Sequence, residues 1–319
     1  MNNNKIISIV VPVFNEQDNI LVFYRAICDT MQNLTYDFEL LFIDDGSQDQ
    51  TAFTIQNLTA TDNRVKLYML SRNYGHQIAL TCGLDHTTGT AIITMDGDMQ
   101  HPPSLIPQLI SEWEAGFEVV QTVRATTEGV SFFKRLSSHL YYKLINKLAQ
   151  SKVVEGGSDF RLMDEKVVAA FRLYRERGRF IRGLIGLLGF KQKTISFTAP
   201  ARFAGVSKFS LKKMLHFALD GITALSTVPL RLSFYIGILA GITSLVLTIH
   251  VLYIKFFTNE AVLGWSTIAA SIFFLGGMQL IGIGILGEYI ARIFQEVKQR
   301  PLYLLSKKIA NGQEIKKDL

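Results

Sequence analysis

Two aspartates separated by one residue follow an apolar segment in the first third of the chain. Asp96 and Asp98 come directly after Ala91–Met95, which has the composition of a buried strand. Carboxylates at positions i and i+2 of an extended segment project to the same side, so both can face one hard divalent cation. Solvated acids in an Asp-Gly turn are the alternative for an isolated pair. The position at a strand end favours a metal that neutralises a pyrophosphate.

Polar residues also follow two other apolar segments of the N-terminal part. Asp44 ends one of them and can accept hydrogen bonds from a base or a ribose, and the glycine two residues later permits a tight turn. Asn15 and Glu16 follow the first apolar segment and can contact a nucleotide or cap the next helix. A role in turns and helix capping explains either segment as well as nucleotide binding does. The secondary-structure elements that position these residues are therefore needed to choose between the two roles.

These elements alternate between strand-like and helix-like composition. Five apolar runs rich in Val and Ile predict strands buried on both faces: Ile6–Phe14, Glu39–Ile43, Val65–Leu70, Ala91–Met95 and Val119–Val123. Helix-like stretches lie among them at Asn19–Met31, Thr51–Leu58 and Gln77–Asp85. The alternation predicts an α/β domain with a mainly parallel, doubly wound sheet, in which ligands bind beyond the carboxyl ends of the strands.

The C-terminal third of the 319-residue chain has a different composition. Leu232–Ile254 and Ala261–Leu286 carry almost no charge, and each is long enough to cross a hydrocarbon core of about 30 Å as a helix. Basic residues lie before the first segment and after the second, whereas the connector at 255–260 is short. The positive-inside rule therefore predicts a transmembrane hairpin with both outer flanks in the cytoplasm.

Two further features point to the lipid bilayer. Phe209–Leu225 places apolar residues at helical spacing and predicts an interfacial helix lying on the membrane, with a core-facing helix as the alternative. Glycines within both apolar segments would let transmembrane helices approach closely, either within one chain or between chains of a homo-oligomer.

The net charge of +6 comes from basic clusters that flank the apolar segments. That placement favours contact with anionic lipid headgroups over nucleic acid. The first apolar run is too short for a signal peptide, so the soluble part is expected to stay in the cytosol. The two cysteines have neither metal-like nor redox-like spacing and are expected to be reduced thiols.

The three polar strand ends, together with Arg72–Gly75, resemble the nucleotide-sugar domain of family 2 glycosyltransferases, which have the GT-A fold. More closely, nearly the whole chain resembles the polyprenyl-phosphate glycosyltransferases, the group that includes dolichol-phosphate mannose synthases and bactoprenol glucosyltransferases. The resemblance extends to Gly157–Arg161, Arg179–Gly183, Arg202–Phe209 and the two C-terminal apolar segments.

This resemblance implies a role for residues at matching positions. Nucleotide-sugar contacts are expected from Pro12, Asn15, Glu16, Asp44, Arg72, Asp96 and Gln100. A divalent cation, Mg²⁺ or Mn²⁺, is expected on Asp96, Asp98 and Gln100. The phosphates of the donor or of the lipid acceptor are expected to contact Arg124, Arg135, Arg202 and Lys208. A guanidinium can clamp a phosphate with two hydrogen bonds, although a solvated surface charge is the alternative for each basic residue.

Catalysis in this interpretation depends on Asp98 and Asp159. Asp159 is the candidate acid nearest the acceptor and could act as a general base, or it could orient Arg161 or cap the next helix. A base is not essential, because a phosphate monoester with a second pKa of about 6 is already largely dianionic near neutrality. No histidine is assigned to metal binding or catalysis, since five of them form no recognisable ligand set: His76, His101, His139, His216 and His250.

The predicted reaction is the inverting transfer of one sugar from a nucleotide-sugar to a polyprenyl phosphate. UDP-glucose is the first expected donor, and GDP-mannose or another UDP-sugar is the next. A processive polysaccharide synthase is an alternative, but the chain has no Gln-x-x-Arg-Trp element and two spans offer little material for a polymer channel. A nucleotide-binding membrane scaffold without activity is a second alternative, which the intact acidic motifs disfavour.

The predicted organisation has four regions. A cytosolic GT-A catalytic domain at 1–207 is followed by an interfacial helix region at 208–231, a transmembrane hairpin at 232–290 and a cytosolic basic tail at 291–319. The chain is expected to be a multi-pass protein of the inner cell membrane, with the catalytic domain and both termini in the cytoplasm.

Overall fold

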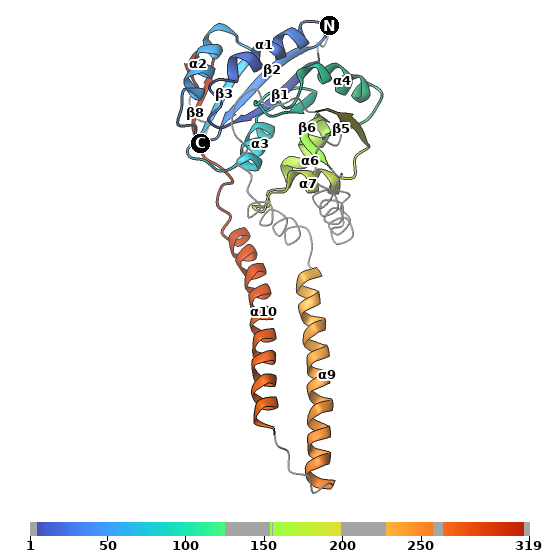
Figure 1. Cartoon of the computed structure of the whole chain (residues 1–319). Coiled ribbons are helices and arrows are strands. Elements are labelled where there is room, and N and C mark those ends of the chain that lie inside the picture. Colours follow the sequence, from blue (N-terminus) through green and yellow to red (C-terminus); the bar gives the residue numbers. More distant parts are fainter. Residues whose placement is uncertain (1–4, 125–153, 155, 199–227, 258–263, 316–319) are drawn as a thin grey trace. The chain divides into compact units, whose positions relative to one another are not determined.

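The computed structural model describes residues 5–124, 154, 156–198, 228–257 and 264–315. The chain divides into two units, Met1–Ala218 with Arg300–Leu319 as the first and Leu219–Gln299 as the second. Figure 1 shows the elements of both units along the chain. The predicted interfacial helix at 209–225 lies outside the described residues.

The described part of the first unit contains a nine-stranded sheet in the order β7-β5-β6-β4-β1-β2-β3-β8-β9. The strands are β1 Ile6–Val13, β2 Asp37–Asp44, β3 Val65–Leu70, β4 Ala91–Thr94, β5 Val119–Arg124, β6 Gly157–Asp164, β7 Gln192–Phe197, β8 Leu305–Ala310 and β9 Gln313–Glu314. Strands β4, β1, β2 and β3 are parallel neighbours, whereas β6 runs antiparallel to both β4 and β5. The predicted mainly parallel sheet is confirmed at its centre, and each of the five predicted strands is present.

Helices cover both faces of this sheet (Figure 1). They are α1 Ile20–Met31, α2 Thr51–Thr61, α3 His76–Asp85, the short η1 Pro103–Leu105, α4 Ile106–Glu114, α6 Glu165–Leu173 and α7 Ile181–Leu187. One hydrophobic core joins α1, α2 and α4 to the sheet, and a second joins α3, α6 and α7 to the opposite face. The doubly wound arrangement predicted from the alternation of strands and helices is therefore confirmed.

The central position of β1 explains why its sequence is apolar at every position except Ser8. Ile9 and Val11 point into the core beneath α1, while Val10 points into the core beneath α3. All three side chains are fully buried, and the one polar side chain of the strand, Ser8, is also buried and donates a hydrogen bond of 2.5 Å to Glu39. Helix α3 packs very close to this strand, because a Cβ built on Gly83 would overlap Val10 and lie 3.1 Å from Ile43.

The strand order creates a crevice at the centre of the sheet. Strand β1 lies between β2 and β4. The strands β2 and β3, which follow β1 in the sequence, lie on one side of it, and the next strand, β4, lies on the other side. The carboxyl ends of these four parallel strands meet at one edge of the sheet. Ligands of open α/β sheets bind at such a switch point, and here it brings together the loops after β1 and β4.

The C-terminal segment differs from the predicted basic tail. Residues 305–314 form β8 and β9, and β8 pairs antiparallel with β3 in the sheet of the first unit. Its inward residues Ile309 and Ala310 are buried, whereas Lys307 and Lys308 give the strand its basic character. A short strand with two adjacent lysines shows little alternation, which is why the sequence pattern did not reveal it.

The described part of the second unit consists of two long helices, α9 Val228–Phe257 and α10 Trp265–Val297. Both are long and apolar enough to cross a membrane, with windows at Leu230–Leu247 and Phe274–Val297 of mean hydropathy 1.8 and 1.4. The two helices include most residues of the two predicted transmembrane segments. A Cβ on Gly282 would lie 3.1 Å from Oγ of Ser233, so this glycine lets the two helices approach as predicted.

Candidate active site

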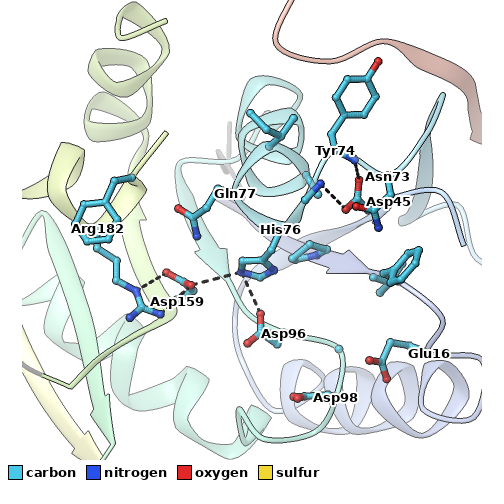
Figure 2. A pocket seen from close by; sticks show the side chains of 18 residues that line it. Glu16, Asp45, Asn73, Tyr74, His76, Gln77, Asp96, Asp98, Asp159 and Arg182 are labelled. Carbon is cyan, nitrogen blue, oxygen red and sulfur yellow. Dashed lines mark hydrogen bonds and ion pairs between the residues drawn. The ribbon is translucent and has the colours of Figure 1, made fainter. Parts of the chain in front are cut away.

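A cavity of about 740 Å³ opens at the carboxyl edge of the parallel strands. Its wall comes from the loops after β1, β2, β3 and β4, from β6 and from the start of α3 and α7. Figure 2 shows the side chains that line it. Its polar lining includes Glu16, Asp45, Asn73, His76, Gln77, Asp96, Asp98, Asp159 and Arg182.

Strand β1 and the loop after it place two of the predicted nucleotide-sugar residues on the cavity wall, Pro12 near the end of the strand and Glu16 in the loop. Asn15 has a different role. It has a left-handed backbone with φ of 55°, its Oδ1 accepts a hydrogen bond from the Gln48 N–H at 2.8 Å, and its own N–H donates to Oγ of Ser47 at 2.9 Å. Asn15 thus joins the loops after β1 and β2, and a direct contact with the nucleotide stays a prediction.

The two adjacent aspartates at the end of β2 have separate surroundings. Asp44 is only 1% exposed, its carboxylate accepts the Ser47 N–H at 3.2 Å, and burial raises its pKa. Asp45 lines the cavity instead and accepts the N–H groups of Tyr74 and Gly75 at 2.7 and 2.9 Å. Its contact with the Arg72–Gly75 segment makes Asp45 a site residue that the sequence reasoning missed, while Asp44 as a nucleotide ligand stays a prediction.

Arg72 lies beside the cavity rather than on its wall. Its guanidinium stacks over the ring of Tyr74, 4.0 Å from the centroid, and donates to the carbonyl of Asn73 at 3.2 Å. A Cβ on Gly46, which has φ of 75°, would lie 2.8 Å from the Asn73 nitrogen, so only glycine lets these two loops touch. Arg72 as a nucleotide-sugar contact is not tested by this arrangement.

The Asp96–Asp98 segment is held in place by a buried histidine. The Asp96 N–H donates to Nδ1 of His101 at 2.9 Å, and the Nε2 of His101 lies 2.6 Å from Oγ of Ser158 on β6. Since Nδ1 accepts a hydrogen bond, the neutral ring carries its proton on Nε2 and donates to Ser158. Burial lowers the pKa of His101, which keeps the ring neutral. His101 therefore orients the acidic loop, a structural role that the sequence reasoning did not assign.

Asp96 and Asp98 both line the cavity, as the spacing predicted. Among the described residues no group of three or more His, Cys, Asp and Glu side chains could hold a metal ion by itself. Two carboxylates fit a cation of the Mg²⁺ or Mn²⁺ kind only if phosphate oxygens and water complete its shell, which is how Mg²⁺ is usually bound with phosphate substrates. The residues present therefore fit a cation that arrives with a diphosphate.

The remaining predicted phosphate and metal residues are only partly described. The amide oxygen of Gln100 accepts a hydrogen bond from Nη2 of Arg124 at 3.2 Å, and neither residue is part of the cavity wall. Gln100 as a metal ligand and Arg124 as a phosphate contact stay predictions. Arg135, Arg202 and Lys208 lie outside the described residues.

Asp159 on β6 forms the far wall of the cavity. It is 7% exposed, and Arg182 at the start of α7 donates to both of its oxygens at 3.0 Å. Arg161 adds a hydrogen bond of 2.9 Å. Although burial alone would raise it, Arg182, His76 and Arg161 hold the pKa of Asp159 well below its usual range. Asp159 therefore stays ionised, pairs with the basic side chains around it and is a weak proton acceptor.

His76 lines the cavity although the sequence reasoning assigned it no role. Its Nε2 lies 3.4 Å from Asp159 Oδ2 and 3.6 Å from Asp96 Oδ1, between the two walls of the cavity (Figure 2). Withdrawal from water lowers its pKa, but the carboxylates of Asp96 and Asp159 outweigh that and raise it to about 9. The available signal was its position, since it directly follows Gly75 at the start of a helix after a strand end.

The electrostatics of the cavity restrict what it can bind. Its wall carries the carboxylates Glu16, Asp45, Asp96, Asp98 and Asp159, against the basic side chains of Arg182 and His76. An anionic diphosphate would be repelled by this excess of acids unless a cation accompanies it. The charge balance therefore favours a ligand that brings its own divalent cation.

Comparison with known proteins agrees with this geometry. The family model for glycosyl transferase family 2 matches residues 8–171. An uncharacterized glycosyltransferase of Bacillus subtilis, YkcC, is 41% identical over 300 residues, covering 94% of this chain and 93% of that protein. A bactoprenol glucosyl transferase of Shigella phage SfX is 41% identical over 299 residues, covering 94% and 98%. The chain belongs to glycosyltransferase family 2, and the predictions of a GT-A fold and of a glycosyltransferase are confirmed.

A solved structure also resembles the chain. It is glucosyl-3-phosphoglycerate synthase from Mycobacterium tuberculosis, with 17% identity, a TM-score of 0.47, and coverage of 69% of this chain and 78% of that one. This similarity is too low to carry an argument about function.

Proposed function

We propose that the chain transfers a single sugar, with inversion, from a nucleotide-sugar to a polyprenyl phosphate. The observation that carries the proposal is the cavity, which places Asp96 and Asp98 opposite the Asp159–Arg182 pair at the switch point of the sheet. The two aspartates suit a cation with a diphosphate, and the Arg182 guanidinium, which is paired with Asp159, adds positive charge that would attract a phosphate acceptor.

The acceptor class rests on the relatives. Bactoprenol glucosyl transferases of three Shigella phages are 40–41% identical over 94% of this chain. Matches of this length include the apolar C-terminal part as well as the catalytic domain, so a lipid-linked phosphate is the acceptor we propose. The same names support glucose as the sugar, with UDP-glucose as donor and GDP-mannose or another UDP-sugar as the next candidates.

Asp96 and Asp98 would hold the divalent cation, Mg²⁺ or Mn²⁺, with Gln100 as the predicted third ligand. When bound, such a cation neutralises the charge that develops on the departing nucleoside diphosphate. Pro12 and Glu16 on the cavity wall would contact the nucleotide-sugar. His101 keeps the acidic loop aimed at this part of the cavity through its hydrogen bond with the Asp96 N–H.

The attacking group is an oxygen of the lipid phosphate. It forms a bond with the anomeric carbon on the face opposite the diphosphate, and the bond from that carbon to the diphosphate oxygen breaks. The phosphate is already largely dianionic near neutrality, because its second pKa is about 6. No proton has to be removed, so Asp159 serves to hold Arg182 and His76 in place rather than to act as a base.

Chain connectivity supports the membrane topology that the charge distribution predicts. The first unit contains the segments on both sides of α9 and α10, since it comprises Met1–Ala218 and Arg300–Leu319. If this unit stays on one side of a membrane, the chain between its two parts must cross an even number of times. We therefore propose a hairpin in the inner membrane, with the catalytic unit and both termini in the cytoplasm.

The domain boundaries that we propose follow from the same argument. Residues 1–207 form the catalytic domain together with the C-terminal strands, 208–231 an interfacial region, and 232–290 the membrane hairpin. Glycines of the hairpin could also mediate a homo-oligomer.

The proposal is tested by screening purified full-length protein with UDP-glucose, other UDP-sugars and GDP-mannose against undecaprenyl and dolichyl phosphate. Mass spectrometry of the lipid product is expected to find one added hexose, formed fastest with UDP-glucose and undecaprenyl phosphate. A polymeric product would favour a processive synthase instead. Nucleotide binding without turnover of any pair, in the presence of Mg²⁺ or Mn²⁺, would favour a scaffold.

A further inference from the structure

His76 has no role in the reaction described above, yet its imidazole lies between the two walls of the cavity. Its Nε2 is 3.4 Å from Asp159 on β6 and 3.6 Å from Asp96 in the loop after β4. The side chain is 40% exposed, so it borders the ligand space. A ring nitrogen within reach of two carboxylates can fix the orientation of both.

The anchor side of this arrangement is rigid. Asp159 is buried and receives hydrogen bonds from Arg161 and from two nitrogens of Arg182. These contacts leave its carboxylate a single orientation, with Oδ2 facing His76. The position of the imidazole is therefore determined by a group that does not itself move.

The backbone that carries His76 is equally well held. The preceding Gly75 has φ of 94°, and its N–H donates to Asp45 at 2.9 Å. The following residue, Gln77, accepts the N–H of Ile181 at 3.0 Å, which joins the start of α3 to the start of α7. His76 thus stands on a helix terminus that is fixed on both sides.

The more exposed carboxylate in this set is that of Asp96. Its carboxylate is 30% exposed and has His76 near Oδ1 and His101 near Oδ2, each at 3.6 Å. Side chains that orient a metal-binding carboxylate from behind typically change metal affinity by about 10-fold to 100-fold when they are removed. His101 is committed to the backbone of the loop, so His76 is the side chain placed to set the direction of the carboxylate.

We propose that His76 is a positioning residue that uses Asp159 as its anchor to hold the Asp96 carboxylate in the orientation that binds the divalent cation. This inference rests on the proposed function, because it needs the cation site at Asp96 and Asp98. It links the acceptor wall of the cavity to the donor wall through one imidazole.

The test measures Mn²⁺ affinity by electron paramagnetic resonance, with purified full-length protein and a fixed concentration of UDP or GDP. His76→Asn removes the Nε2 position and is expected to raise the dissociation constant for Mn²⁺ at least about 10-fold. His76→Gln places an amide nitrogen near the original Nε2 and is expected to stay within about 3-fold of the wild type, on the same scale. In transfer assays, His76→Asn should need more Mn²⁺ for half-maximal rate and recover much of kcat at saturation.

Control variants separate positioning from folding and from the proposed function. His86→Gln removes an imidazole at the other end of α3, where the ring packs against Tyr68 with 4.5 Å between centroids, and should leave Mn²⁺ affinity unchanged even if it lowers Tm. His76→Leu replaces His76→Asn should the latter not fold. Wild-type affinity in the Asn or Leu variant, or equal losses in the Asn and Gln variants, would overturn the inference alone. If Asp98→Ala also leaves Mn²⁺ affinity unchanged, the cation site and the inference both fall.

Discussion

The hydroxyl of Tyr303 donates a hydrogen bond of 2.8 Å to the carboxylate of Asp85, at the end of α3. Tyr303 belongs to the segment between α10 and β8, and Asp85 also pairs with Arg175 at 2.8 Å. The segment that follows the second apolar helix is therefore bound to the helix whose first residue is His76. The C-terminal residues are therefore part of the first unit, which contains the cavity.

Removing this hydrogen bond should weaken the catalytic unit. Tyr303→Phe leaves the ring in place and is expected to lower the free energy of unfolding by about 1 kcal/mol, the usual net value of one such bond. Lys307→Ala is the matched control, since that side chain is 54% exposed and its nearest carboxylate is 3.9 Å away. Thermal unfolding of both variants in detergent checks the difference, and equal Tm values would show that the bond contributes nothing.

The close packing of α3 on β1 predicts an unusual glycine effect. Replacing glycine by alanine inside a helix normally stabilises it by up to about 1 kcal/mol. Gly83→Ala should instead destabilise the protein by about 1–3 kcal/mol, because the new methyl overlaps Val10. The double variant Gly83→Ala with Val10→Ala should regain part of this loss relative to the sum of the single variants. Strict additivity in thermal or chemical unfolding would contradict the proposed contact.

The low pKa of Asp159 predicts the shape of the pH–rate profile. A carboxyl whose pKa is depressed stays ionised until the pH falls below its ordinary value, so its stabilising contribution is lost only in strong acid. Asp159 should therefore produce no acid limb between pH 5 and pH 8. We expect an acid limb near pH 6, about the second pKa of the lipid phosphate.

A change of acceptor can show whether the acid limb comes from the lipid phosphate or from a group of the enzyme. A phosphonate analogue of the polyprenyl phosphate has a higher second pKa, and it should move the acid limb of kcat/KM to higher pH. A limb that stays in place with the phosphonate would point to an enzyme group. In that case the assignment of Asp159 as an anchor would have to be given up if Asp159→Asn also abolished the limb.

Much of the fold was predictable because its signals are local. The central strands are apolar on both faces, and Val10 and Val11 show why, since they enter different cores. Strands β6 and β7 were not predicted. Strand β6 contains Ser158, Asp159 and Arg161, whose polar side chains find their partners only in the folded site: Ser158 bonds to His101, and Asp159 pairs with Arg161 and Arg182. Strand β7 lies at the edge of the sheet, with two consecutive residues exposed, so its pattern is weak.

The site was predictable where the chain places its residues at strand ends. Asp96 and Asp98 follow that rule and line the cavity. Asp45, His76 and Arg182 were missed because their contacts join residues that are far apart in the sequence. Arg182 is 23 residues from Asp159, and His76 is 83 residues from it. Neighbouring aspartates such as Asp44 and Asp45 look alike in sequence, and only packing shows which one reaches the cavity.

The central claim is that Asp96 and Asp98 hold a divalent cation against the diphosphate of the donor while a lipid phosphate attacks the sugar. It is tested most directly by Asp98→Ala in purified, folded, full-length protein, with saturating Mn²⁺, UDP-glucose and undecaprenyl phosphate. The account predicts a loss of transfer rate of at least about 100-fold, the order expected when charge stabilisation at the leaving group is removed. A rate close to that of the wild type would contradict it.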